Sequence, residues 1–292
     1  MSIDNKVIAV GLGIAAIGSL CVYYLTPAAA EGDRRLVRLA SALLGKLHKS
    51  SHTGMRVLPP PELAEKGHGG TVSNRRLYFQ LRVLDAPDAN QAHEGIIKLR
   101  ESLRGVGKGW ILYRDTCSAH SVGVLVWSEE PEDFALKLPN AIASCGKLVE
   151  RRGWTMLGRT YANGHERDLE DFLLKKPART LLCEDERWAI WYPMRRKGLF
   201  YLRPPAEQCD MLLTHASIGK SYADAGAAKD VRLKCYGIDE KDNEFVIGLI
   251  GKELFPLSRI VEDLRKTEHT STYMQSLGPF FIGLRIHSSS ES

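Results

Sequence analysis

The chain has 292 residues, of which 44% are hydrophobic and 26% are charged, a globular composition that excludes a mainly disordered, collagen-like or polytopic membrane protein. Its 40 Lys and Arg residues against 35 Asp and Glu residues give a net charge of +5, which is too weakly basic to indicate nucleic-acid binding. The six cysteines form no C-x-x-C pair and no zinc-type spacing, so neither a disulfide scaffold nor a zinc ribbon is expected.

The first segment of the chain is apolar. Val7 to Leu25 contains no charged residue, and a helix over this range would be about 28 Å long, close to the thickness of a bilayer's hydrocarbon core. We therefore predict that residues 1–30 form an N-terminal membrane anchor. A cleaved signal peptide is the alternative, because residues 28–30 are three alanines. Lys6 is the only basic residue before the span and several follow it, so the positive-inside rule predicts a single-pass protein with its soluble part on the cytoplasmic or matrix-like side.

Residues 31–73 are predicted to connect this span to the rest of the chain. In Arg34 to Lys49, leucine side chains share one face of a helix and basic residues occupy much of the remainder. This pattern fits a helix lying on an anionic membrane surface, and it also fits an amphipathic helix packed on the following domain. Ser50 to Ser73 is rich in proline and glycine, which indicates a linker.

The remaining sequence contains one order of elements twice. In residues 74–162 the predicted elements are a strand over 76–84, a helix over 88–103, strands over 110–115 and 121–128, a helix over 131–144 and a strand over 154–161. In residues 186–287 they are a strand over 187–193, a helix over 206–219, strands over 231–236 and 244–250, a helix over 252–268 and a strand over 279–286. Residues 163–185 connect the halves. We therefore predict an α+β fold, with two tandem ferredoxin-like (βαββαβ) halves that form a dimeric α/β-barrel type unit preceded by one N-terminal transmembrane helix.

Three positions could carry chemistry. His215 lies late in an amphipathic helix among apolar residues, which would keep its imidazole neutral and able to bind a metal, although such a histidine is commonly structural. Tyr192 ends an apolar strand, and the basic residues 195–197 behind it suit a flat anionic ligand or a solvated turn. Arg232 lies in a half-apolar strand and points either inward or to solvent. The sequence contains no Ser-His-Asp order, P-loop or HExxH motif.

Four stretches resemble the chlorite dismutase-like haem proteins, a family that includes the coproheme decarboxylases. The stretches are LGRTYANGHERDLEDFLL, WAIWYPMRRKG, THASIGKSY and YMQSLGPFFIGLRI. The resemblance covers about Leu77 to Ile286. It implies two ferredoxin-like halves in each subunit, a haem held by the C-terminal half, and a homo-oligomer that is commonly a pentamer.

The resemblance also implies roles for individual residues. His215 matches the proximal haem ligand, and Tyr192 matches the tyrosine that acts as the radical residue in the decarboxylases. Arg159 matches an arginine that binds a haem propionate. Arg196 stands where the decarboxylases usually carry a lysine that contacts a propionate.

Two further positions follow from the same resemblance. Arg232 lies near the distal arginine of the chlorite-degrading branch, whereas a count without gaps places Asp230 at that position. A histidine that binds iron through one ring nitrogen needs an acceptor for the other. Glu268 is the candidate acceptor, with His269 beside it.

The sequence therefore predicts a membrane-anchored haem-binding protein whose cofactor is haem b or coproheme. Its predicted activity is that of a haem-dependent, peroxide-using oxidoreductase, either coproheme decarboxylase-like or chlorite dismutase-like. One alternative is a non-catalytic structural subunit, attached through Val7 to Leu25 to a larger membrane complex. The other alternative is a haem carrier or sensor that uses His215 as its ligand. No nucleic-acid partner is expected.

Overall fold

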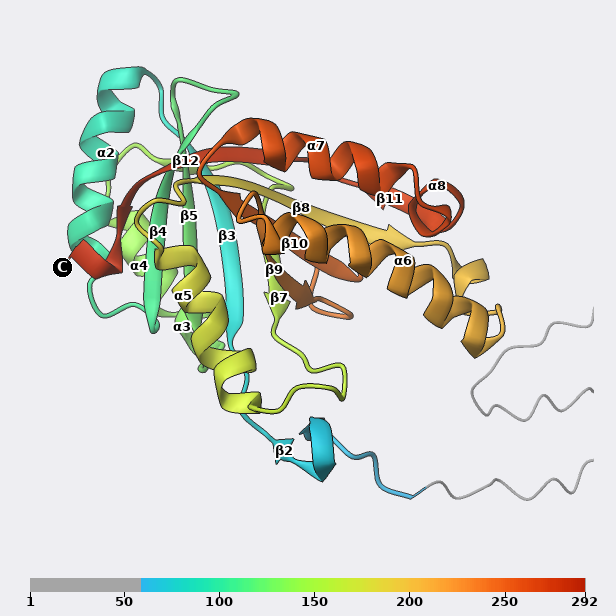
Figure 1. The fold of residues 1–292 in the computed structure, drawn as a ribbon. Helices are drawn as coiled ribbons and strands as arrows, with labels where there is room; N and C mark the ends of the chain where they lie inside the picture. Colours follow the sequence, from blue (N-terminus) through green and yellow to red (C-terminus); the bar gives the residue numbers. More distant parts are fainter. Residues whose placement is uncertain (1–58, 292) are drawn as a thin grey trace, which may run out of the picture. The chain divides into compact units, whose positions relative to one another are not determined.

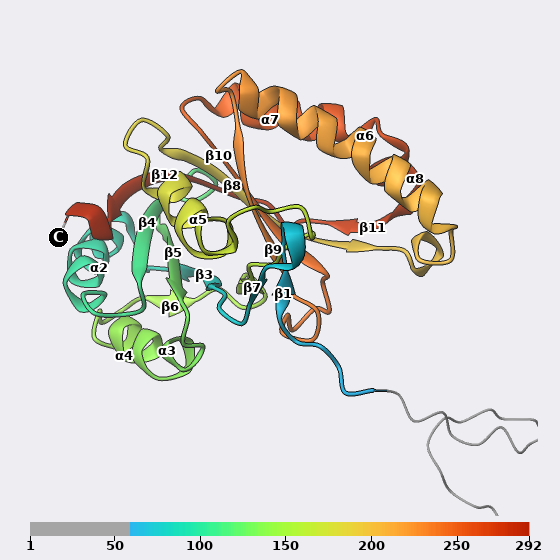
Figure 2. The same ribbon diagram turned by 60° about the horizontal axis from the view of Figure 1, so that its bottom comes forward.

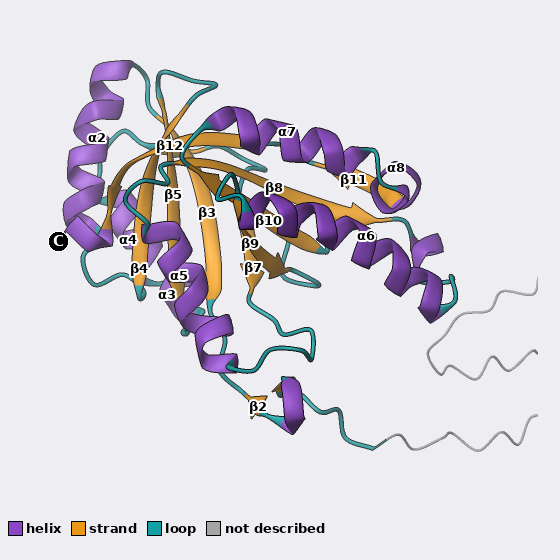
Figure 3. Ribbon diagram, viewed as in Figure 1, coloured by secondary structure: helices purple, strands orange, loops and turns teal. Residues whose placement is uncertain are grey.

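The computed structural model describes residues 59–291 and divides the chain into two units, Met1–Pro61 and Glu62–Ser292. All the helices and strands of the described residues belong to the second unit (Figures 1 and 3). The predicted membrane span and the basic amphipathic segment lie outside the described residues.

The first half of this unit follows the predicted order of elements. Its strands and helices are β3 (Tyr78–Asp85), α2 (Ala89–Ser102), β4 (Gly109–Asp115), β5 (Ser121–Ser128), α3 (Glu132–Ala135), α4 (Lys137–Ala143), β6 (Val149–Glu150) and β7 (Met156–Arg159). The short strands β1 (Glu65–Lys66) and β2 (Val72–Ser73) pair with each other before it. A single helix was predicted over 131–144, but two are present. Pro139 has no N–H to donate to Ala135, so one helix cannot continue from α3 into α4.

The second half repeats the order after a connector. The connector holds the π-helix η3 (Asp171–Lys175) and α5 (Lys176–Leu182). The half itself consists of β8 (Trp188–Arg196), α6 (Pro205–Asp224), β9 (Lys229–Lys234), β10 (Phe245–Gly251), α7 (Leu254–Arg265), α8 (Glu268–Tyr273), β11 (Met274–Leu277) and β12 (Phe281–Ser288). The mixed α+β fold predicted from the sequence is confirmed.

The pairings of the long strands close a ring. In order around the ring, the strands are β8, β12, β4, β5, β3, β7, β9 and β10, and β10 pairs with β8 again (Figure 2). All the pairings in this ring are antiparallel, and seven residue pairs join β10 to β8. The two halves meet where β12 pairs with β4 and where β7 pairs with β9. Only Arg159 and Lys234 are paired at the second of these joints.

Alternation along each strand gives the second half two buried faces. Ala189 and Trp191 of β8 belong to the core shared with the first half, together with Phe79, Trp127 and Phe281. Ile190 and Tyr192, one residue out of phase, pack in a separate cluster with residues of α6 and α7. Figure 1 shows α6 and α7 running along the sheet beside β8 and β10. The outer face of this part of the sheet is therefore covered by helices.

β8 runs further than the predicted strand over 187–193. Pro193 has no N–H and marks the point where the strand changes its neighbour. Before it, Trp188 to Trp191 pair with β12, and after it Met194 to Arg196 pair with β11. β8 therefore continues through Pro193, although proline ordinarily occurs in edge strands or at the ends of strands.

The predicted localisation, a single-pass membrane protein, is corrected by the structure. Within residues 59–291, no helix is both long enough and apolar enough to cross a bilayer. The longest of them, α6, has 20 residues but carries Glu207, Asp210, Lys220 and Asp224, which would be costly to place in hydrocarbon.

Candidate functional site

The face of β8, β10 and β9 that lies under the helices carries three of the residues singled out from the sequence. Arg232 of β9 pairs with Ile247 of β10, which pairs in turn with Tyr192 of β8. Side chains of directly paired residues in antiparallel strands share one face. Tyr192 and Arg232 therefore lie on the same face, on either side of Ile247. Asp230, two residues before Arg232, lies on that face as well.

A cavity of about 580 Å³ lies between this face and the helices. α6 contributes Leu213, Ala216 and Ala223 to its wall, and α7 contributes Ile260 and Leu264. Most of the wall is apolar, but cationic side chains also reach it. These are Lys176, Lys220, Lys229, Arg232 and Arg265.

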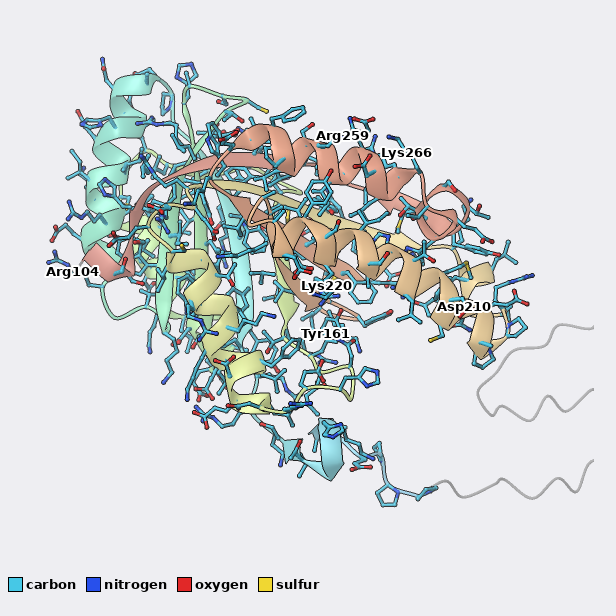
Figure 4. The ribbon with its side chains drawn as sticks, in the orientation of Figure 1. Arg104, Tyr161, Asp210, Lys220, Arg259 and Lys266 are labelled. Atoms are coloured by element: carbon cyan, nitrogen blue, oxygen red, sulfur yellow. The ribbon has the colours of Figure 1, made fainter. Side chains whose placement is uncertain are left out.

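The cations of the cavity differ in their partners. Lys229 pairs with Glu186 at 2.8 Å, and Lys220 pairs with Asp224 at 2.6 Å on α6, where Lys220 is labelled in Figure 4. In the described part of the chain, Lys176 and Arg265 form no ion pair with a carboxylate. Of the five cations, sequence patterns singled out only Arg232, because the other four come from three helices and one strand.

His215 lies on the cavity side of α6. Burial, followed by the positive charges of Arg196 and Arg232, lowers the pKa of its imidazole to about 4, so the ring is neutral near pH 7. Its Nδ1 atom is buried, and no hydrogen-bond partner for it is present among the described residues. The sequence-based expectation of a neutral histidine in apolar surroundings agrees with this geometry.

A second imidazole, His269 of α8, lies directly behind His215. The ring centroids are 5.0 Å apart and the rings meet edge to face. His269 is 1% exposed, and its Nε2 accepts a hydrogen bond of 3.0 Å from the Nε–H of Arg196. Burial, Arg196 and His215 lower the pKa of His269 to about 3. Sequence reasoning noted His269 only as the neighbour of Glu268, because no pattern reveals that α8 packs on α6.

Arg196 is held by aromatic rings. Its guanidinium lies 4.8 Å from the ring centroid of Phe200 and 4.7 Å from that of Phe245. One of its terminal nitrogens, Nη1, donates to the hydroxyl of Tyr201 at 3.3 Å. Arg196 does not line the 580 Å³ cavity. The structure thus places Arg196 against His269 and away from the wall of this cavity.

Tyr192 and Arg232 both reach the cavity, in different surroundings. Tyr192 is 5% exposed and its ring stacks on Phe280 with a centroid distance of 4.7 Å. Burial raises the pKa of its hydroxyl well above the usual value, so Tyr192 keeps its proton. Arg232 is half exposed, and its Nε is 2.9 Å from a carboxylate oxygen of Asp230. Arg232 and Asp230, the two residues that the resemblance offers for the family's distal position, therefore both line the cavity and form an ion pair with each other.

The remaining two predicted site residues lie elsewhere. Arg159 of β7 forms an ion pair of 3.0 Å with Glu65 and does not line the cavity. Glu268 begins α8, is exposed, and lines a separate cavity of about 300 Å³ together with Glu207 and Asp210. No hydrogen bond joins Glu268 to His215 in the described structure.

The family model described as chlorite dismutase matches residues 169–286, which include the connector helices and nearly all of the second half. This part of the chain is therefore similar in sequence to the chlorite dismutase family. The match contains every wall residue of the 580 Å³ cavity. No curated protein matches the sequence significantly.

Solved structures share the fold of this chain at low sequence identity. A protein provisionally assigned as a chlorite dismutase has 15% identity and a TM-score of 0.60, covering 73% of this chain and 96% of its own. A heme-binding protein from Thermus thermophilus has 19% identity and a TM-score of 0.55, with coverages of 80% and 96%. The imidazole complex of chlorite dismutase from Candidatus Nitrospira defluvii has 14% identity and a TM-score of 0.55, with coverages of 74% and 93%. At these identities the likeness establishes the fold.

Proposed function

We propose that the protein binds an iron porphyrin, haem b or coproheme, in the 580 Å³ cavity, with His215 as the axial ligand of the iron. The observation that carries this proposal is a neutral imidazole on the wall of a large apolar cavity, with one ring nitrogen that is buried and has no hydrogen-bond partner among residues 59–291. Iron in a porphyrin takes neutral imidazole as an axial ligand. Two comparisons support the assignment, the match to the chlorite dismutase family model and the fold shared with a heme-binding protein.

The walls suit a porphyrin in size and polarity. A cavity of about 580 Å³ lies within the range of about 300–1,000 Å³ typical of ligand and cofactor sites. The aliphatic side chains of α6, α7 and β10 can cover the faces of a flat macrocycle. Lys176 and Arg265, which have no carboxylate partner among residues 59–291, can pair with porphyrin carboxylates at the rim. A bound haem would supply an iron that changes oxidation state and binds small ligands.

The ring geometry indicates which nitrogen of His215 is available. Nδ1 is buried, whereas His215 as a whole lines the cavity. We infer that Nε2 is the nitrogen presented to the iron. A neutral imidazole that binds through Nε2 carries its proton on Nδ1.

The test is an absorption titration of the full-length protein with haem and, separately, with coproheme. A stoichiometric Soret band is expected for the wild type, and it should shift or weaken strongly in His215→Ala. His93→Ala is the matched control, because His93 is an exposed histidine of α2 in the other half. An unchanged spectrum in His215→Ala would remove His215 from the site. A wild type without any specific Soret band would contradict haem binding itself.

A peroxide-dependent oxidation on the bound porphyrin is the second candidate function. The observation that favours it is the row of Tyr192, Ile247 and Arg232 on the cavity wall. A buried tyrosine that keeps its proton can give up a hydrogen atom, and an arginine can stabilise negative charge on a bound oxyanion. This activity is distinguished from simple haem binding by product formation on addition of peroxide.

We further propose that the protein assembles as a homo-oligomer, with a pentamer as the form expected from the resemblance. Large exposed hydrophobic side chains gather near η4 (Gly198–Phe200), where the hydroxyls of Tyr201 and Tyr236 are 2.8 Å apart. Leu199, Leu202 and Ile238 are exposed in the same region. Light scattering on the purified chain measures its mass, and a monomer at all concentrations would contradict the proposal.

A further inference from the structure

We propose that Arg196 and His269 act as positioning residues that deny His215 a hydrogen-bond acceptor, and so favour the ferrous over the ferric form of the bound haem. This inference rests on the proposed function. It concerns the side of His215 that faces away from the cavity, where the structure places a second imidazole.

Arg196 has a fixed orientation. Its guanidinium lies over the rings of Phe200 and Phe245, at 4.8 and 4.7 Å from their centroids. Its Nη1 donates to Tyr201, and its Nε donates to His269. An arginine side chain carries only donors and keeps its proton in proteins. Arg196 can therefore only give a hydrogen bond to His269.

The contact with Arg196 determines the tautomer of His269. Its Nε2 accepts from Arg196 at 3.0 Å, so Nε2 must carry the lone pair. In a neutral imidazole the proton then lies on Nδ1. The Nδ1 of His269 is buried and has no partner in the described structure, so it is an N–H donor without an acceptor.

The tautomer of His269 has a consequence for His215. When Nε2 of His215 binds iron, its Nδ1 also carries a proton and needs an acceptor. Metal-bound histidines almost always donate that proton to a carboxylate, a carbonyl or water, which makes the ligand a stronger electron donor. In this site the neighbouring ring, whose centroid is 5.0 Å away, has no free acceptor, because its Nε2 lone pair is taken by Arg196, and Glu268 lines a different cavity. His215 is thus left as a weak electron donor.

The net charge near His215 acts in the same direction. Arg196 and Arg232 act on His215 as positive charges, while Asp230, which pairs with Arg232, opposes them. Ferric haem carries one more positive charge than ferrous haem, so nearby cations destabilise the ferric form relative to the ferrous form. A weak axial donor in a positive environment favours ferrous iron, which suits reversible ligand binding or haem transfer more than peroxide cleavage.

The tautomer is tested first, without haem. In ¹⁵N-histidine-labelled full-length protein, His269 is expected to show a protonated Nδ1 and an unprotonated Nε2. Arg196→Met should release this preference, because it removes the donor to Nε2. The opposite tautomer in the wild type would overturn the inference whatever the haem titration gives.

The reduction potential of the haem-loaded protein is tested next, by titration with dithionite as the electron donor. His269→Glu places an acceptor behind His215 and should lower the potential, and His269→Gln should lower it by less. His269→Phe keeps an aromatic ring without an acceptor, so its potential should stay near the wild-type value. A potential unchanged in both His269→Glu and His269→Gln, or lowered equally in His269→Phe, would overturn the inference.

Glu268→Gln distinguishes the two neighbouring residues. If Glu268 accepted the proton of His215, this variant would raise the potential, whereas the Arg196–His269 arrangement predicts no change. His93→Glu on α2 controls for the added negative charge of His269→Glu, and its potential should match that of the wild type. A wild type that gives no Soret band would overturn the proposed function and this inference with it. A normal Soret band with the wrong tautomer would overturn this inference alone.

Discussion

At the scale of single residues, the site depends on side chains that burial keeps uncharged. His215 and His269 are neutral because an imidazolium would be poorly solvated between α6 and α8 and would lie close to Arg196. Tyr192 keeps its phenolic proton for the same reason. The sequence predicted neutrality for His215 from its apolar neighbours alone. It could not predict the second imidazole, which reaches His215 only through the packing of two helices far apart in the chain.

Gly219 gives a test of the cavity at one position. It lies on α6 one turn after His215, lines the cavity, and a Cβ added there meets no atom within 4 Å. Gly219→Leu should fill the space a porphyrin needs and weaken haem binding by at least about tenfold. The smaller Gly219→Ala should bind haem normally and gain roughly 0.5–1 kcal/mol of stability, because alanine favours a helix interior. Haem binding by Gly219→Leu equal to that of the wild type would place the porphyrin elsewhere.

Tyr192→Phe separates binding from chemistry. The substitution removes one hydroxyl and keeps the ring that stacks on Phe280, so haem and coproheme affinity should be unchanged. Any decarboxylation of coproheme with peroxide should be lost, while chlorite or peroxide turnover should remain. Tyr222→Phe is the control, since the Tyr222 hydroxyl donates to Asp263. Product analysis by mass spectrometry decides the outcome, and decarboxylation retained in Tyr192→Phe would remove the radical role.

At the scale of elements, apolar patterning predicted the strands over 231–236 and 244–250 close to the observed β9 and β10. In β9 the apolar residues recur with a period of two, whereas β10 is a continuous apolar run bounded by a polar turn. Their register was not predictable, and it is the register that brings Tyr192, Ile247 and Arg232 into one row. The helix predicted over 206–219 extends to Asp224; in this extension Lys220 and Asp224 form an ion pair one turn apart, and Tyr222 packs against the cluster under the helices.

Gly248 of β10 tests the packing of the sheet under the cavity. A Cβ at this position would lie 2.6 Å from ring atoms of Trp191, which is fully buried. Gly248→Ala should therefore destabilise the protein by about 1–3 kcal/mol through overpacking. Gly198→Ala is the matched control, because a Cβ there meets nothing within 4 Å. Urea unfolding measures both, and a Gly248→Ala variant as stable as the control would contradict this packing.

At the scale of the whole molecule, the duplicated α+β unit was predictable and the closed ring was not. The repeated order of elements is visible in the sequence, whereas the ring depends on pairings between residues as distant as Tyr113 and Arg285. The same limitation explains why the position of Arg159 away from the cavity was not predicted. Its motif matched the resemblance, but the strand β7 that carries it lies across the weak joint to β9, and its ion pair is made with Glu65 before the first half.

Acid should destabilise the fold through the two buried imidazoles. Their pKa values fall from 6.5 in an unfolded chain to about 4 for His215 and about 3 for His269. Between pH 6.5 and these lowered pKa values, the unfolded state binds more protons than the folded state. The contribution of the two imidazoles to stability is therefore greatest above pH 6.5 and falls as the pH drops toward 4. The double variant His215→Phe/His269→Phe should flatten this part of the profile. Thermal unfolding followed by circular dichroism between about pH 4 and 7.5 checks it, and an equally steep profile in the double variant would assign the dependence to other groups.

β12 is synthesised after every other strand of the ring, yet it lies between β8 of the second half and β4 of the first. A nascent chain that still lacks Phe281 to Ser288 has all of β8, β9 and β10 but no strand between β8 and β4. The ring therefore cannot close on the ribosome until these residues have emerged.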